Sequence, residues 1–173
     1  ELEKLEPAVL VTGDPVWFSF GFASIFNDAM IHLFRNSLDH GIERPQERES
    51  LGKPEQGTIT LNATATPEGI SLELYDDGAG LDLERLRGSR PERQNLSDEE
   101  TAELIFASGV STAKAVSNIS GRGVGMDAVR VFLEQRKCSI HIELLKENAQ
   151  PTRKGTPFKF VIFIPKQELV QIH

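Results

Sequence analysis

The sequence predicts a two-layer α/β sandwich in which helices cover one face of a mixed, mostly antiparallel sheet. Polar and apolar side chains alternate over residues 58–66, 70–75 and 139–144, a pattern typical of strands with one buried face. Apolar side chains recur at helical spacing over 22–41 and 125–136, which indicates two amphipathic helices. With 173 residues, 39% of them hydrophobic, the chain can bury a real core, and we expect it to form a single domain.

The N-terminal part of the chain predicts a strand followed by the longer helix. Residues 8–12 indicate a short strand, and the apolar segment 16–20 forms either another strand or a tucked segment. Gly41 directly follows the helical pattern, where glycine commonly ends a helix. The positions that we expect on the buried face of this helix are Phe26, Ala29, Met30, Leu33, Ser37 and Leu38. The charged residues 44–55 predict a surface connection with one helical turn.

The middle of the chain predicts a β-hairpin whose second strand ends at an acidic residue. Residues 67–69 (Pro-Glu-Gly) are typical of a turn, and they join the alternating segments 58–66 and 70–75. The second of these strands delivers Asp76 to its C-terminal end. Later in the chain, residues 139–144 and 157–164 predict the last two strands.

Residues 82–120 differ from the rest of the chain because they offer little that would anchor them to a core. We expect a short helix from Asp98, as its N-cap, to Phe106, followed by a stretch rich in Ser, Thr, Ala and Gly. A segment of this length and composition predicts a mobile lid or functional loop. For the next helix, the predicted core positions are Met126, Val129, Val131, Phe132 and Leu133.

Charge and cysteine content exclude several classes of protein. The net charge of −7 argues against a general nucleic-acid binder, which needs a basic face. Cys138 is the single cysteine, so neither an internal disulfide nor a paired-cysteine metal site is expected, and a small buried side chain is its simplest role. No apolar run is long enough to span a membrane and no signal sequence is present, so we expect a cytoplasmic protein without direct membrane insertion. The chain begins at Glu1, which suggests a domain of a longer protein.

The longer helix carries the first candidate motif, a row of polar side chains. His32, Asn36 and His40 are four residues apart, so on a regular helix they lie on one face. The amide oxygen of Asn36 is a neutral hard ligand suited to Mg²⁺, and His32 could orient or accept a proton near a transferred phosphoryl group. The alternative is a polar stripe facing solvent. A zinc site is disfavoured because Asn is a poor zinc ligand and no cysteine is nearby.

The second motif, residues 76–80 (Asp-Asp-Gly-Ala-Gly), follows a predicted strand. A carboxylate at Asp76 can accept a hydrogen bond from the exocyclic amine of adenine, which guanine does not offer at that position. Gly78 and Gly80 allow the backbone to turn sharply and approach a flat base. A tight turn after an edge strand is the alternative.

The third motif, residues 121–125 (Gly-Arg-Gly-Val-Gly), precedes the second helix. Glycines there free backbone N–H groups to surround an anion, and the helix N-terminus adds partial positive charge. Arg122 could reach a phosphate, and Lys114 is a weaker candidate. Met126 stands where a dinucleotide fingerprint needs glycine, and no P-loop sequence occurs. The alternative is a flexible loop before a helix. Thr156 lies in a turn that could reach a base through water.

Together, these motifs make the chain similar to the ATP-binding catalytic domain of histidine kinases, within the GHKL superfamily of gyrase-type and heat-shock chaperone ATPases. The similarity is closest to CheA-like chemotaxis kinases and extends over about residues 13–165. Residues 32–43 resemble the N box of that family, 76–81 its G1 box and 121–127 its G2 box. Leu104 to Phe106, with Gly109, Ser111 and Thr112, resemble its F box.

The resemblance implies a Bergerat-type fold, ATP and Mg²⁺ as cofactors, and a role for each matched position. Asn36 would ligate Mg²⁺, and His32 and His40 would flank the phosphates as catalytic residues, with His32 where many relatives carry a catalytic Glu. Asp76 would bind the adenine amine, and residues 82–120 would form the ATP lid. The residues implied to contact the nucleotide are Asn36, Asp39, His40, Asp76, Gly78, Gly80, Lys114, Gly121, Arg122, Gly123, Val124, Gly125, Met126 and Thr156.

The implied function is transfer of the γ-phosphate of ATP to a histidine on a separate phosphoacceptor domain, in cis or in trans. A response regulator and coupling or receptor proteins would be further partners, and the parent protein would dimerise through a domain outside this chain. Ser108, Val110 and the polar residues 134–138 depart from the family pattern around the lid and the second helix. The alternatives are an ATPase switch of the same superfamily and a degenerate nucleotide-binding scaffold. His32 counts against the ATPase, and intact Asn36 and Asp76 count against the scaffold.

Overall fold

The computed structural model describes residues 6–88, 90–107, 125–145 and 155–170 and contains one five-stranded sheet. The strand order is β1-β2-β3-β5-β4, and only the β1–β2 pair is parallel. The strands are β1 (Ala8–Gly13), β2 (Thr58–Thr66), β3 (Gly69–Asp76), β4 (Ser139–Leu144) and β5 (Phe158–Pro165). The strand predictions from the sequence are therefore confirmed within one residue at each end.

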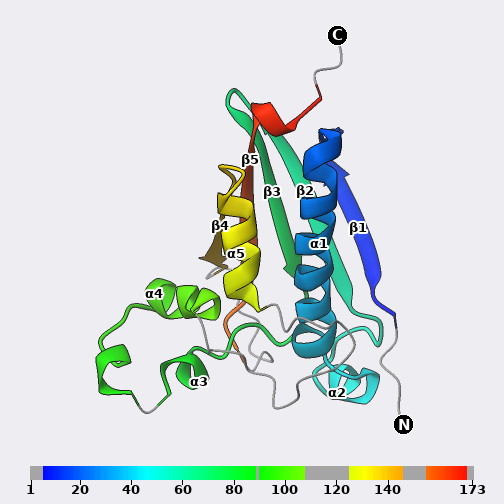
Figure 1. The fold of residues 1–173 in the computed structure, drawn as a ribbon. Coiled ribbons are helices and arrows are strands. Elements are labelled where there is room, and N and C mark those ends of the chain that lie inside the picture. The colour runs from blue at the N-terminus through cyan, green and yellow to red at the C-terminus, as the bar shows by residue number, and fades with distance from the viewer. Residues whose placement is uncertain (1–5, 89, 108–124, 146–154, 171–173) are drawn as a thin grey trace.

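Two helices, α1 (Phe20–Asn36) and α5 (Met126–Glu134), cover one face of the sheet (Figure 1). Between the two layers lies a core of fully buried side chains, among them Phe22, Leu33, Ile59, Leu74, Leu133, Ile162 and Ile164. The helices run in opposite directions, so the end of α1 and the start of α5 lie at the same end of the sheet (Figure 1). The predicted two-layer sandwich is confirmed.

The end of the first helix differs from the prediction in its geometry. After Asn36 the chain continues through a π-helical turn, Ser37–Gly41, in which the Ile42 N–H bonds to the Ser37 carbonyl at 2.7 Å. This wider turn rotates the following side chains away from the α-helical row. Leu38, expected in the core, is consequently 36% exposed, whereas Ser37 is buried as predicted.

The predicted core face of α5 is correct in part. Met126, Val129 and Leu133 are buried, at the three- and four-residue spacing of one helical stripe. Val131 and Phe132 are 49% and 42% exposed, so their assignment to the core is wrong. At about 100° per residue, both positions fall outside that stripe.

Residues 83–107 are better anchored than the sequence suggested. They form α3 (Leu83–Arg87), α4 (Asp98–Glu103) and two short 3₁₀ turns, Pro91–Arg93 and Leu104–Phe106, at one end of the sheet (Figure 1). Leu83, Leu86, Ala102 and Phe106 are buried. Ser97, not Asp98, is the N-cap of α4, in a capping box with Glu100. Residues 108–120 of the predicted lid, including Ser108 and Val110, lie outside the described residues.

Three smaller segments complete the described part of the chain. The predicted helical turn in 44–55 is α2 (Pro45–Ser50), and a 3₁₀ turn, Lys166–Glu168, follows β5. Within the segment 16–20, Phe18 forms an isolated bridge with Leu169 and Phe20 begins α1, so the segment is not a strand. None of the described helices has the length and apolar character needed to cross a membrane.

Candidate functional site

Two of the three sequence motifs lie at the same end of the sheet, below α1 in Figure 1. The first motif occupies the last turns of α1, and β3 delivers Asp76 to the same end. Of the third motif, Gly125 is the N-cap of α5, and Lys114, Gly121, Arg122, Gly123 and Val124 lie outside the described residues. The two helix ends and the end of β3 therefore surround one region.

Two glycines bring the first and second motifs into contact. A side chain at Gly78 would place its Cβ 2.1 Å from the Gly41 carbonyl oxygen, and one at Gly41 would reach 2.8 Å from an Asp76 carboxylate oxygen. The Ala79 N–H donates to the Gly41 carbonyl at 2.8 Å, and the Gly78 N–H donates to Asp76 Oδ1 at 3.0 Å. The close approach at Gly78 is thus to the end of the helix, and the approach to a base stays a prediction. This contact holds the Asp76 carboxylate beside that helix.

The loop after Asp76 also binds the segment that precedes β5. Leu81 and Thr156 exchange two backbone hydrogen bonds of 2.8 and 2.9 Å, and the Gly155 N–H donates to the Ala79 carbonyl at 2.9 Å. Gly80 has a φ of +80°, which favours glycine, and a side chain there would meet the Thr156 carbonyl. Thr156, which the sequence places in a turn near the base, therefore lies directly beside the second motif.

The polar row of the first motif is divided by the π-helical turn. His32 and Asn36 lie on α1 and are partly buried, whereas Asp39 and His40 belong to the turn and are exposed. The Asn36 amide nitrogen donates to the Met126 sulfur at 2.7 Å, so the start of α5 orients this side chain. The oxygen of the same amide is a hard donor of the kind that binds Mg²⁺.

The sequence analysis missed a group of charged side chains behind the second motif. We call Glu43, Arg48, Lys53 and Asp77 the charge cluster; Arg48 is fully buried, and the side chains of Glu43 and Lys53 are 4% and 6% exposed. In the sequence these residues resemble an ordinary charged surface segment, because charge alone does not reveal burial. The available signal in the sequence was the mixture of acidic and basic residues in the short segment 43–53, which contains Pro45 and Gly52.

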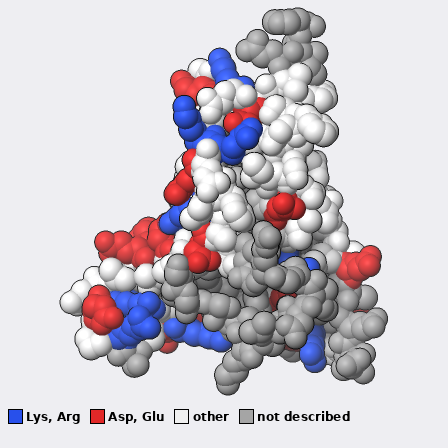
Figure 2. All heavy atoms as spheres, in the orientation of Figure 1, with Lys and Arg blue, Asp and Glu red and all other residues white. Residues whose placement is uncertain are grey.

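Away from the site, the surface charges are mixed in sign and the single cysteine is unreactive. Figure 2 shows Lys and Arg beside Asp and Glu on one face, with a largely uncharged area over the upper part of α1. Burial raises the pKa of the Cys138 thiol to about 11, which keeps it protonated and unreactive.

On the outer face of the sheet, the Lys159 ammonium bonds to Glu73 and Glu143 and lowers the pKa of Glu143.

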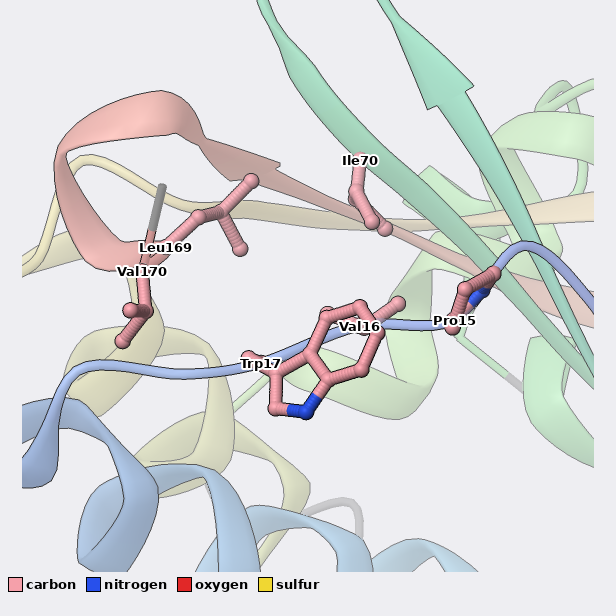
Figure 3. Close-up of a pocket in the computed structure, with 6 residues that line it drawn as sticks. All are labelled: Pro15, Val16, Trp17, Ile70, Leu169 and Val170. Atoms are coloured by element: carbon pink, nitrogen blue, oxygen red, sulfur yellow. The ribbon is translucent and has the colours of Figure 1, made fainter. Parts of the chain in front are cut away.

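An apolar hollow of about 230 Å³ lies at the opposite end of the sheet (Figure 3). Pro15, Val16, Trp17, Ile70, Leu169 and Val170 line it. Ile70 is near the start of β3, whereas Asp76 is its last residue, so this hollow is separate from the motif-bearing end. Its lining has no titratable side chain and offers no reactive chemistry.

The chain is similar to several known proteins. Residues 26–168 match the protein family described as histidine kinase-, DNA gyrase B- and HSP90-like ATPase. The chemotaxis protein CheA of Treponema pallidum (strain Nichols) is 42% identical over 168 residues, which are 94% of this chain and 20% of that protein. CheA of Klebsiella aerogenes is 48% identical over 140 residues, or 78% of this chain and 21% of that protein. The chain thus spans about a fifth of the length of these curated relatives.

Solved structures with the same fold include two histidine kinases. The mycobacterial sensor histidine kinase MprB superposes with a TM-score of 0.57 at 18% identity, covering 94% of this chain and 87% of that chain. The catalytic domain of histidine kinase ThkA gives a TM-score of 0.54 at 15% identity, covering 92% of this chain and 78% of that chain. At these identities the similarity establishes the fold.

Proposed function

Because the chain belongs to the histidine kinase-, DNA gyrase B- and HSP90-like ATPase family, we propose that it is the ATP-binding catalytic domain of a CheA-like histidine kinase. It transfers the γ-phosphate of ATP to a histidine on a separate phosphoacceptor domain. The observation that carries this proposal is the contact between two distant motifs: the end of α1 lies against Asp76 through Gly41 and Gly78. A polar helix end and an adenine-accepting carboxylate thereby border one site.

In this proposal, Asp76 accepts a hydrogen bond from the adenine amine, and the backbone from Gly78 to Gly80, together with Thr156, borders the base. The carboxylate is oriented for that role by the Gly78 N–H at 3.0 Å. The backbone N–H groups at the start of α5, from Gly125 onward, face the phosphates. Residues 121–124 and Lys114, which lie outside the described residues, would extend this phosphate site. Binding of the base and positioning of the phosphates supply most of what phosphoryl transfer requires of a protein.

Asn36 fits the role of a Mg²⁺ ligand. Its amide is oriented by Met126, and its oxygen is a hard, neutral donor. Among the described residues, no group of three His, Cys, Asp or Glu side chains could hold a metal by itself, so phosphate oxygens and water would complete the coordination. Bound Mg²⁺ neutralises charge on the phosphate oxygens. His32 lies one turn before Asn36, and His40 lies in the turn after it. In this proposal both histidines border the phosphates.

The acceptor histidine, the response regulator and any coupling or receptor proteins belong to the rest of the signalling system. The chain spans a fifth of its relatives, so these partners, and dimerisation through another domain, are proposals for the parent protein. A location in the cytoplasm, where ATP and a response regulator are available, follows from the same proposal.

The test is phosphoryl transfer in trans from γ-labelled ATP. This chain, mixed with a separately purified phosphoacceptor domain of a CheA relative, should label that domain, and the chain with Asn36→Ala should not. Label released only as inorganic phosphate would favour the ATPase switch. Nucleotide binding without transfer or hydrolysis would favour the scaffold.

A further inference from the structure

The segment between α1 and β2 contains a charge cluster whose contacts converge on the loop after Asp76. Arg48 donates to Asp77 Oδ2 at 2.9 Å and to Glu43 Oε2 at 3.1 Å. Its Nε donates to the Pro54 carbonyl at 2.7 Å. The other Asp77 oxygen accepts the Thr58 N–H at 2.9 Å. The Asp77 carboxylate is thereby fixed between α2 and the first residue of β2.

Lys53 holds the backbone of the same loop. Its ammonium donates to the carbonyl oxygens of Asp77 and Gly78 at 3.0 and 3.1 Å, and to Glu43 Oε1 at 2.5 Å. An ammonium has three N–H donors, so all of them are used. Two consecutive carbonyls that follow Asp76 are therefore tied to one buried charge.

Burial on this scale is difficult to explain as a stabilising device. Removing charges from water costs several kcal/mol per ion, and replacing buried ion pairs by apolar side chains is often neutral or stabilising. What such a cluster does supply is fixed geometry. Here the fixed atoms are the peptide groups of Asp77 and Gly78, and the Gly78 N–H is a donor to the Asp76 carboxylate.

We propose that Lys53 and Arg48 are positioning residues for adenine recognition, which they serve by holding the loop that orients Asp76. This inference rests on the proposed nucleotide site. Glu43 lies two residues after Gly41, so the cluster also joins the end of the polar helix to the loop. Without the Lys53 ammonium, the Asp77 and Gly78 carbonyls lose a shared donor, and the Gly78 N–H holds the Asp76 carboxylate less firmly in its direction toward the base amine.

The test compares two nucleotides that differ in one group on the base. ADP carries the exocyclic amine that Asp76 would bind, whereas inosine diphosphate carries an oxygen there. Calorimetry on Lys53→Met should show ADP affinity lowered by about tenfold, the cost of a misaligned hydrogen bond to a charged group, with inosine diphosphate nearly unchanged. Lys166→Met is the matched control, because Lys166 is exposed at the far end of the sheet, and it should change neither affinity.

A double-mutant cycle separates positioning from general damage to the structure. If Lys53 acts through Asp76, Lys53→Met should have little further effect on ADP binding in a chain that already carries Asp76→Asn. An undiminished effect there, or an equal loss for ADP and inosine diphosphate, overturns the proposal. If Lys53→Met fails to fold, Lys53→Arg is the second variant, because it keeps the charge but cannot donate in the same geometry to Glu43 and the two carbonyls. An unchanged preference for ADP over inosine diphosphate in Lys53→Arg would also overturn the proposal. Unchanged ADP affinity in Asp76→Asn alone would instead refute the adenine site itself.

Discussion

At the scale of single residues, the proposed site depends on a few side chains that neighbouring groups orient. Asp76 ends β3 and receives the Gly78 N–H, and Asn36 ends α1 and contacts Met126. The sequence predicts a role for both residues, for Asp76 from its place at the end of a strand and for Asn36 from its four-residue spacing with His32 and His40. Their orientation could not be predicted, since it depends on contacts between segments 37 to 90 residues apart.

Asp76→Asn should weaken ATP and ADP binding to the same extent, because it removes recognition of the base that both share. A loss of about 1.5–3 kcal/mol is expected for a hydrogen bond to a charged acceptor. Calorimetry with both nucleotides measures this directly. A loss confined to ATP would instead indicate that Asp76 acts at the γ-phosphate.

Cys138 gives a prediction on pH. Its folded-state pKa is raised to about 11 from an ordinary value of 9.0 because it is buried, so folding favours the neutral thiol. The stability that the buried neutral thiol contributes is fully present below pH 9. It is lost as the pH rises from about 9 to 11, because the thiol of the unfolded chain ionises first. Between pH 8 and 10, the free energy of unfolding of the parent chain should fall by about 1 kcal/mol more than that of Cys138→Ala, measured by urea unfolding. Parallel pH profiles for the two chains would contradict this.

At the scale of elements, the loop after β3 and the end of α1 are packed so closely that only glycine fits. Gly78→Ala would place a Cβ 2.1 Å from the Gly41 carbonyl, so both elements must move apart. We expect a loss of about 2–4 kcal/mol in stability, as for other overpacked sites, together with loss of nucleotide binding. Thermal unfolding and calorimetry test this.

Gly21→Ala is the matched control for that substitution. Gly21 lies in the first turn of α1, and a Cβ there would meet only a flexible Arg136 side chain at 3.8 Å. Alanine should stabilise the helix by about 0.5–1 kcal/mol and leave nucleotide binding unchanged. If Gly78→Ala behaved like Gly21→Ala, the close contact between the two elements would be refuted.

A second link between elements holds α4 to the edge of the sheet. Glu103 accepts the Ile142 N–H of β4 at 2.9 Å and pairs with Arg130, whose guanidinium lies 3.7 Å from the centre of the Phe106 ring. Arg130→Met should therefore speed amide exchange at residues 101–106 and at Ile142. Unchanged protection at both places would show that this link does not anchor α4.

The sequence analysis succeeded for helices and strands whose hydrophobic residues recur with a clear period. It failed for features that depend on packing between distant segments. Alternation predicted three strands and helical spacing predicted α1 and α5, because these patterns reflect one buried face. The π-helical turn, the Ser97 cap and the burial of Arg48 depend on contacts with distant segments. The parallel pairing of β1 with β2 is likewise invisible to a local pattern.

At the scale of the whole molecule, the two-layer sandwich brings the end of α1, the start of α5 and the end of β3 to one end of the sheet (Figure 1). The order of the strands makes this possible, since the hairpin β2–β3 carries Asp76 back beneath α1. The apolar hollow at the opposite end takes no part in this arrangement. One end of the molecule therefore contains the described residues that we assign to nucleotide binding.

The most direct test of the account is calorimetry of ATP binding with and without Mg²⁺, on the chain and on Asn36→Ala. The account predicts that Mg²⁺ tightens ATP binding to the unaltered chain by about tenfold or more, and that Asn36→Ala retains only the Mg²⁺-independent affinity. The same Mg²⁺ effect in both chains would refute the metal site. No ATP binding by the unaltered chain would contradict the account as a whole.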